Sequence, residues 1–480
     1  MGSIALTRQV GRGSIWTLAP GRLDLERVIP RPATAPPAVF GGEQRWVHGS
    51  AWDDKKVRLW DLEALPGSRP LELRRSGSWY LAWPRLHPKG DWLTAFQIAE
   101  VRAIFWPLRN RYPSVVDGYT PIARPVAFSP DGRWLATSWA DSKLRLWPMP
   151  GTGPREPRTL ELPETTLWES IVFDPRGRYL FAVGNSDRAW VVPLDGSRPR
   201  RLPIYSEDTM LFAVAVSPSG RRVATAWGYG LGAKTLRLHD VETGETRVFP
   251  LPTAPEIHGS SATGGGGNPS VLSIGFLDEA TAYTSGGAGL RRWNLESGTN
   301  ELVAAGVIYF ELLGGDRRRA LTTTLVDGSP TEGSELCTRL QVRDLVSGTT
   351  RPLPPFETRG VVIPPALSGE IAAMSGPDGV LVGRLSTDTA QLLVGHEGSV
   401  QGIAISPDGR WVATSAEDNT LRLWPMPDLS KPPLHTLPHD ELVAKLRTLT
   451  NLRVVRNPGS PTGWKLEVGP FLGWKDVPTW

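Results

Sequence analysis

Two stretches of the chain, 277 residues apart, have nearly the same sequence. The first, SPDGRWLATSWADSKLRLWPMP, runs from Ser129 to Pro150, and the second, SPDGRWVATSAEDNTLRLWPMP, runs from Ser406 to Pro427. A long self-match without a gap means that one small structural unit is used more than once. Weaker copies recur at a spacing of roughly 40–50 residues, which is typical of propellers, solenoids and other repeat arrays.

Each copy has the pattern of four short strands. An apolar strand precedes a Ser-Pro-Asp-Gly turn, in which proline presets φ and glycine accepts a positive φ. A strand of small residues follows (WLATS or WVATS), then a polar turn near Asp141 or Asp418, and then LRLW, which alternates with a period of two. A less regular strand, such as 159–162, closes the unit. These segments are too short and too rich in proline for helix pairs, so the sequence predicts an all-β propeller of four-stranded antiparallel blades.

On these residues the chain resembles the WD-repeat β-propeller family. The best match is Gly395-His396, followed by SPDGRWVATS, Asp418 and the LRLW strand. The resemblance implies one structural hydrogen-bonded set in this blade, formed by His396, Ser415, Asp418 and Trp424. Such a set makes physical sense, because a buried indole N–H and a buried carboxylate each need a partner. Other units keep parts of the pattern as structural residues, namely Ser138, Asp141 and Trp147, and Asp54 and Trp60.

The resemblance covers residues 41–437, and about nine units can be distinguished there. Because one ring usually has four to eight blades, we expect a seven-bladed WD-repeat propeller over 119–437. Residues 1–118 are then extra N-terminal blade-like units that belong to a neighbouring or larger ring, and one larger ring is the alternative. The incomplete first unit indicates a chain cut from a longer protein.

The last 43 residues, 438–480, differ in character from the repeats. His439-Asp440 can cap a short helix whose apolar face holds Leu442, Val443, Leu446 and Leu449. The segments NLRVV and WKLEV predict a hairpin around Asn457. The ending resembles C-termini of bacterial WD-repeat proteins in which the propeller follows a Ser/Thr kinase or a STAND-type NTPase, and this implies such a domain, in the same or a neighbouring chain, as a partner.

Composition disfavours several other classes of protein. Lys and Arg total 53 against 49 Asp and Glu, and the basic clusters at 198–201 and 317–319 are short, so a nucleic-acid-binding stripe is disfavoured. The single cysteine, Cys337, excludes an intrachain disulfide and fits a reducing compartment. The N-terminus has no apolar signal-peptide core, and no run approaches a membrane span. We therefore expect a cytoplasmic protein without a membrane partner.

The chain carries no motif for a familiar reaction. It has no GxxxxGK[ST] loop, no kinase HRD or DFG sequence and no GxSxG elbow. His435 and His439 are four residues apart, but Pro438 prevents a shared helical face, and no Cys or acidic neighbours stand at ligand spacing. The sequence thus predicts no catalytic residue, no cofactor and no metal site.

A tryptophan recurs at one rim position of the aligned units. It stands two residues before the Asp that lies six before the blade Trp, and the near-twin unit has Ala416 there. Because tryptophan is enriched in binding hot spots, this position is a candidate interaction surface, although each Trp could instead pack on a neighbouring blade. The candidates are Trp52, Trp139 and Trp227.

The predicted function is a non-catalytic scaffold or sensor module that presents propeller loops to a protein or peptide partner. The alternative is a propeller hydrolase or lyase, which requires converging acid and base residues with shifted pKa values in the central channel. Nucleic-acid binding is a third and weaker hypothesis, which predicts steep salt dependence.

Overall fold

The computed structural model of the chain contains two compact units. One comprises residues 64–69 and 113–429, and the other comprises 1–63, 70–112 and 430–480. The structure describes residues 3–9, 12–19, 22–30, 39–41, 46–50, 56–61, 64–65, 68–74, 81–86, 92–97, 102–107, 114–117, 126–138, 141–150, 157–163, 168–184, 188–202, 210–229, 235–252, 271–314, 317–325, 337–359, 363–376, 379–387, 389–396, 398–433, 436–442, 444, 452–459 and 463–468.

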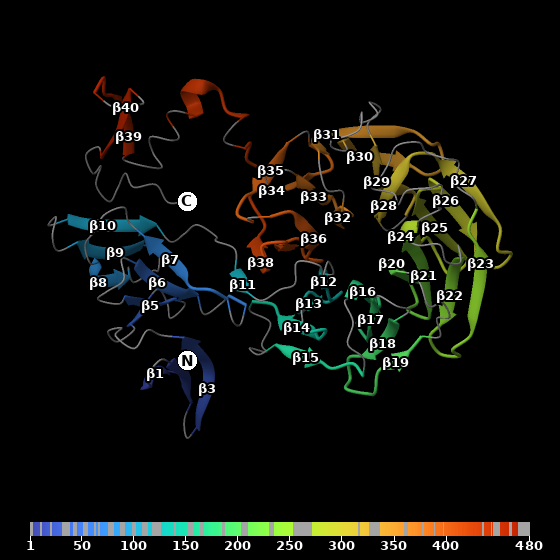
Figure 1. Cartoon of the computed structure of the whole chain (residues 1–480), viewed down its shortest axis with the longest axis horizontal. Coiled ribbons are helices and arrows are strands. Elements are labelled where there is room, and N and C mark those ends of the chain that lie inside the picture. Colours follow the sequence, from blue (N-terminus) through green and yellow to red (C-terminus); the bar gives the residue numbers. More distant parts are fainter. Residues whose placement is uncertain are drawn as a thin grey trace. The chain divides into compact units, whose positions relative to one another are not determined.

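The unit that contains 113–429 is a ring of seven four-stranded antiparallel sheets, the blades of a β-propeller (Figure 1). This confirms the predicted all-β class and the predicted seven-bladed ring. Within each blade the first strand lies nearest the centre of the ring, and first strands of successive blades contact one another.

Blades 1 to 3 contain β12 (Val126–Phe128), β13 (Trp134–Ser138), β14 (Leu144–Pro148) and β15 (Arg158–Leu160); β16 (Trp168–Phe173), β17 (Tyr179–Gly184), β18 (Arg188–Pro193) and β19 (Arg200–Arg201); and β20 (Met210–Val216), β21 (Arg222–Tyr229), β22 (Thr235–Asp240) and β23 (Thr246–Pro250). Blades 4 to 6 contain β24 (Val271–Phe276), β25 (Thr281–Gly286), β26 (Leu290–Asn294) and β27 (Asn300–Ala304); β28 (Val307–Leu313), β29 (Arg319–Leu325), β30 (Cys337–Asp344) and β31 (Thr350–Arg359); and β32 (Ala366–Ser368), β33 (Ile371–Gly376), β34 (Gly379–Arg384) and β35 (Ala390–Leu393).

Blade 7 combines strands from the two ends of the ring. Three come from its C-terminal end, β36 (Val400–Ile405), β37 (Trp411–Ala416) and β38 (Thr420–Pro425), and the outer strand is β11 (Ser114–Asp117). In this pairing Val116 lies opposite Leu421, and its side chain is only 3% exposed. The predicted domain boundary after residue 118 falls behind β11, so the ring takes its closing strand from the segment assigned to the N-terminal units.

The Ser-Pro-Asp-Gly turns of the two near-twin repeats are built alike. In blade 7 the hydroxyl of Ser406 donates to Asp408 (2.6 Å) and accepts the backbone N–H of Trp411 (2.9 Å). The glycine of this turn, Gly409, has φ of 67°, as the sequence predicts for a residue that must adopt the left-handed region. The equivalent turn in blade 1 has the same bonds from Ser129.

The apolar core is divided among the boundaries between blades. Each of seven buried clusters joins two consecutive blades, including the pair formed by the last and the first. At that closing boundary Trp147 of blade 1 packs with Leu421 of blade 7, Val116 of β11 and Leu65 from the 64–69 segment. A four-stranded sheet has two faces to cover, so each blade depends on both of its neighbours.

Arginines of the outer strands connect neighbouring blades. In four blades an arginine at one register position donates to the backbone carbonyl just after the third strand of the next blade. The four bonds are Arg158 to Leu194 (2.7 Å), Arg200 to Val241 (2.6 Å), Arg247 to Leu295 (2.8 Å) and Arg351 to Leu385 (2.5 Å). Their sequence signal is Arg-x-Leu or Arg-x-Phe, whose apolar residue is buried. Sequence analysis did not recognise this motif, because the fourth strands are the least regular part of the repeat.

The second unit contains four further sheets. Sheets β4–β7 and β8–β10 have the antiparallel meander order of blades, as expected for extra N-terminal blades. The strands of this unit are β1 (Ser3–Gln9), β2 (Arg12–Ala19), β3 (Arg22–Pro30), β4 (Val39–Gly41), β5 (Trp46–Ser50), β6 (Lys56–Asp61), β7 (Leu71–Arg74), β8 (Leu81–Leu86), β9 (Trp92–Gln97), β10 (Arg102–Pro107), β39 (Leu452–Arg456) and β40 (Trp464–Val468).

The C-terminal segment contains the predicted short helix and hairpin. A single helical turn covers residues 439–442, and β39 pairs with β40 around a turn in which Asn457 accepts a hydrogen bond from the N–H of Gly459 (3.2 Å). Leu442 lies in this turn, whereas the other three predicted members of the apolar face, Val443, Leu446 and Leu449, lie outside the described residues.

Val116→Asp tests the closing strand. A carboxylate at this buried site would have to be desolvated between blades 7 and 1, so we expect a loss of about 3 kcal/mol or more in the free energy of unfolding. Val346→Asp is the matched control, because Val346 is 80% exposed, and it should change stability by less than about 0.5 kcal/mol. Denaturant unfolding measures both, and equal midpoints for the two variants would show that β11 does not hold the ring closed.

Candidate functional site

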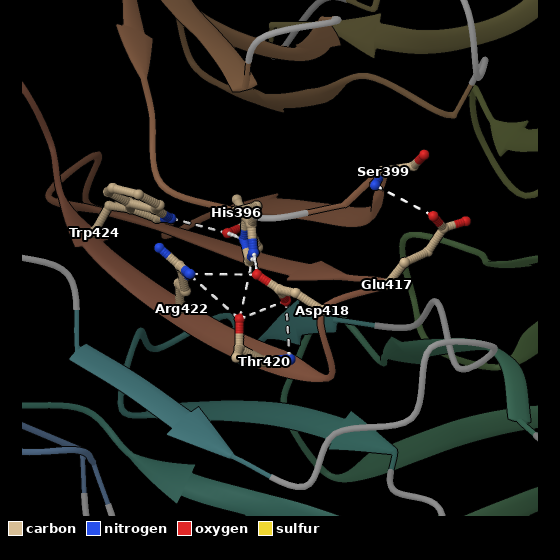
Figure 2. A network of polar contacts seen from close by, with 8 residues as sticks. His396, Ser399, Glu417, Asp418, Thr420, Arg422 and Trp424 are labelled. Carbon is tan, nitrogen blue, oxygen red and sulfur yellow. Dashed lines mark hydrogen bonds and ion pairs between the residues drawn. The ribbon is translucent and has the colours of Figure 1, made fainter.

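The polar network of blade 7 is the largest set of predicted site residues that the structure brings together (Figure 2). His396 lies just before β36, Asp418 in the turn between β37 and β38, and Trp424 in β38. The Nδ1 atom of His396 is 2.9 Å from Asp418 Oδ2, and its Nε2 atom is 2.6 Å from the hydroxyl of Thr414. Trp424 Nε1 donates to the same hydroxyl at 2.8 Å. Histidine, threonine, aspartate and tryptophan therefore form one continuous chain.

The hydroxyl in this network belongs to Thr414, and the predicted Ser415 does not take part. Trp424 pairs with Val412 across the strands, and side chains alternate between the two faces of a strand. Thr414, two residues after Val412, therefore shares the face of Trp424, whereas Ser415 points to the other face. Ser415 is fully buried, and its hydroxyl has no hydrogen-bond partner among the described residues.

Asp418 is held by three further contacts. The backbone N–H and the hydroxyl of Thr420 donate to Oδ1 (3.0 and 2.7 Å), and Arg422 donates to Oδ2 (3.3 Å) (Figure 2). Burial lowers the pKa of His396 below its usual value, and Arg422 acts in the same direction, while Asp418 opposes the shift. The imidazole is therefore neutral at pH 7.

This arrangement suits scaffolding better than catalysis. A general base needs a ring nitrogen within reach of a substrate proton, but both nitrogens of His396 are bound inside the blade. The imidazole is nearly buried, with 3% of its side chain exposed. The His396, Thr414 and Asp418 set therefore joins the loop before β36 to the turn after β37.

Blade 1 repeats half of this arrangement. Trp147 Nε1 donates to the hydroxyl of Thr137 (2.9 Å), and Asp141 forms a two-bonded ion pair with Arg145 (2.5 and 3.0 Å). The predicted Ser138 is displaced by one residue from the working hydroxyl, as in blade 7. It is fully buried without a hydrogen-bond partner among the described residues.

The strand register extends the same two positions to all seven blades. The threonine position holds Thr137, Ala182, Thr225, Thr284, Thr322, Met374 and Thr414, and the tryptophan position holds Trp147, Val192, His239, Trp293, Arg343, Gly383 and Trp424. The side-chain bond between the positions occurs in four blades, including Trp293 to Thr284 (2.9 Å) and His239 with Thr225 (3.2 Å). Sequence analysis missed His239, although LRLHD aligns with LRLWP.

Two blades have lost both partners together. Blade 2 has Ala182 and Val192, and blade 6 has Met374 and Gly383, so neither pair has a polar side chain to satisfy. In blade 6 a side chain from the preceding blade takes up the space, because Phe356 of β31 lies 3.1 Å from the point that a Cβ on Gly383 would occupy. Phe356 is fully buried.

The N-terminal site residues are only partly described. Trp60 lies in β6 with 5% of its surface exposed, and its Nε1 has no partner among the described residues. The register explains this, because Trp60 pairs with Val47 and the position two residues on is Gly49, which has no hydroxyl. The predicted Asp54 lies outside the described residues.

The candidate tryptophan surface stays a prediction. Trp52 and Trp139 lie outside the described residues, and Trp227 is placed by its backbone in β21, opposite Leu211. The register puts Trp227 level with Ala416, as the sequence alignment assumed. Ala416 is 1% exposed, so in blade 7 this position packs against its surroundings.

Among the described residues, no group of three or more His, Cys, Asp and Glu side chains has the spacing of a metal site. The same part of the chain contains no helix with the length and apolar character needed to cross a membrane.

Comparison with known families identifies two segments. A model described as "WD domain, G-beta repeat" matches residues 126–148 and 388–425. The first spans three strands of blade 1, and the second spans the polar network and the three C-terminal strands of blade 7. No curated protein matches the chain.

Thr414→Val and Ser415→Ala distinguish the two hydroxyls. The valine keeps the shape of threonine but leaves the Trp424 indole N–H without its acceptor, so we expect a loss of about 2 kcal/mol in stability. Ser415→Ala removes a buried hydroxyl that has no partner among the described residues, so it should be neutral or slightly stabilising. Thermal unfolding measures both, and the opposite ranking would return the role to Ser415.

His239 predicts a loss of stability in acid. Burial lowers its pKa to about 4, with a smaller contribution from Arg237, so the unfolded chain takes up a proton that the folded blade resists. The stabilising contribution is complete above pH 6.5 and is lost as the pH falls toward 4, by on the order of 3 kcal/mol. His239→Trp restores an indole donor to Thr225 and cannot be protonated. Unfolding curves at pH 7.5 and 4.5 should show a smaller difference for this variant than for the parent, and equal differences would contradict the assignment.

Proposed function

Since the chain is a member of the WD-repeat β-propeller family, we propose that it is a non-catalytic scaffold or sensor module that binds a protein or peptide partner through the loops of its ring. The observation that carries this proposal is the commitment of the blade-7 polar groups to one another. The histidine, carboxylate and hydroxyl that could serve as acid, base or nucleophile are instead used to hold the blade. A closed ring of mutually packed blades offers rigid loops, which reduces the entropy lost on binding.

The alternative, a hydrolase or lyase acting in the ring centre, has one observation in its favour. Glu311 in β28 has a pKa raised to about 7 by desolvation, which is a value suited to a general base. The seven innermost strands contribute no histidine, lysine, arginine, aspartate or cysteine as a second acid, base or nucleophile. A single carboxylate supports binding better than it supports a reaction.

Basic residues of the ring also favour a protein partner over nucleic acid. Arg200 and Arg317, which belong to the two clusters in the sequence, donate to the backbone carbonyls of Val241 (2.6 Å) and Phe276 (2.5 Å). Arginines that satisfy carbonyls are not available as a stripe for phosphates. As the partner class we propose an effector domain, such as a kinase or NTPase, in the cytoplasm.

Affinity capture on the purified full chain tests this proposal. A protein recovered on the chain is purified, and its direct binding is then measured by titration. We expect saturable binding that is lost with the ring-opening variant Val116→Asp and kept with Val346→Asp. A substrate panel is assayed in parallel. Turnover that disappears in a folded His396→Gln or Glu311→Gln variant would favour the enzyme alternative and overturn the scaffold.

A further inference from the structure

The innermost strands of the seven blades share one register position that circles the ring axis. In each blade this residue pairs with the residue that follows the partner of the tryptophan position. We call these residues the axial belt; they are Ala127, Val172, Ala215, Gly275, Glu311, Ala366 and Ala404. Six of the seven are small and apolar, and one is a carboxylate.

Glu311 is accessible to solvent although protein surrounds it. Among the described side chains of the innermost strands it alone is fully exposed, whereas its neighbours in β28, Phe310 and Leu312, are buried or half-buried. Those two approach Gly275 of blade 4, so the alternation of the strand directs Glu311 toward blade 6, where the belt residue is Ala366. Protein atoms nevertheless enclose the carboxylate enough to desolvate it strongly. Exposure and enclosure together describe a group that faces a narrow axial space.

The axial lining carries negative charge and no positive charge. The seven innermost strands contain two acidic residues, Glu169 and Glu311, and no lysine, arginine or histidine. The side chain of Glu169 lies outside the described residues. This lining contrasts with the formal charge of +4 of the whole chain.

The cation that acts on Glu311 is already engaged elsewhere. Arg317 lowers the pKa of Glu311 by its charge, but its guanidinium donates to the carbonyls of Phe276 (2.5 Å) and Leu277 (3.4 Å). Glu311 forms no hydrogen bond or ion pair with any described residue. Desolvation outweighs Arg317 and raises the pKa of Glu311 to about 7. The carboxylate would therefore be stabilised by a further positive charge from outside the ring.

We propose that the axial belt of this ring is a binding site for one cationic group, a guanidinium or a primary amine, with Glu311 as its anionic partner. The alanines and the glycine of the belt leave room for a slender alkyl chain to approach. The cation can belong to a side chain of a protein partner or to a free amine. This inference rests on the proposed function, because it names the chemistry that a bound partner would present.

Titration of the full-length chain with Ac-Gly-Arg-Gly-NH2 tests the proposal. We expect saturable binding that is at least about tenfold weaker for Glu311→Gln and for a peptide with uncharged citrulline in place of arginine. Because a cation lowers the pKa of the carboxylate, binding at pH 7 should release protons. The calorimetric enthalpy should then differ between phosphate and HEPES buffers for the parent chain and not for Glu311→Gln.

Glu301→Gln is the matched control, because Glu301 is also exposed but lies in the outer strand β27, 3.5 Å from Arg292. It should bind the arginine peptide as the parent does. Agmatine tests the free-amine source, and weaker binding of agmatine than of the peptide would assign the cation to a protein side chain. Equal binding by the parent and Glu311→Gln, or no saturable binding to the parent, would overturn the proposal. If a captured protein partner still bound Glu311→Gln with full affinity, the scaffold function would stand and the axial site would fall.

Discussion

The packing of each blade against its two neighbours is the interaction on which the whole ring depends. The seven apolar clusters lie at the seven boundaries between blades, and Trp147 and Trp424 each face the boundary with the preceding blade. A chain of such sheets would end in two uncovered faces, so the array is stable only when it closes. Closure is achieved by β11, whose pairing with β38 ties the beginning of the ring to its end. It also covers a sheet edge that would otherwise be open to aggregation.

Strand register decides where polar groups can be buried in these boundaries. A tryptophan donor and a threonine acceptor meet because they stand diagonally on one face of adjacent strands. Blades that keep one partner keep the other or replace it by a group that can still bond, as His239 does with Thr225. Blades 2 and 6 instead replace both, which leaves no polar atom without a partner at these positions. The repeat has therefore diverged in pairs.

The outside and the axis of the ring have different electrostatic roles. On the outside, arginines such as Arg158 and Arg247 satisfy carbonyls of the next blade and add to the apolar contact. Around the axis, Glu311 stands among small apolar residues with no charge partner. A ring held together by its outer arginines and its apolar boundaries leaves its loops and its axial belt available for a partner.

The sequence by itself determined the blade, its turns and the number of blades in the ring, because a period of two, a Ser-Pro-Asp-Gly turn and an LRLW strand are local features. It also brought His396, Asp418 and Trp424 together, through their spacing in one repeat. It could not choose between Thr414 and Ser415, since adjacent residues of a strand face opposite sides and only the pairing with β38 says which side holds Trp424. The tertiary structure alone decided the closing role of β11, the arginine contacts between blades and the axial belt around Glu311. Each of these joins segments from different blades, and a local pattern carries no information about which distant strands become neighbours.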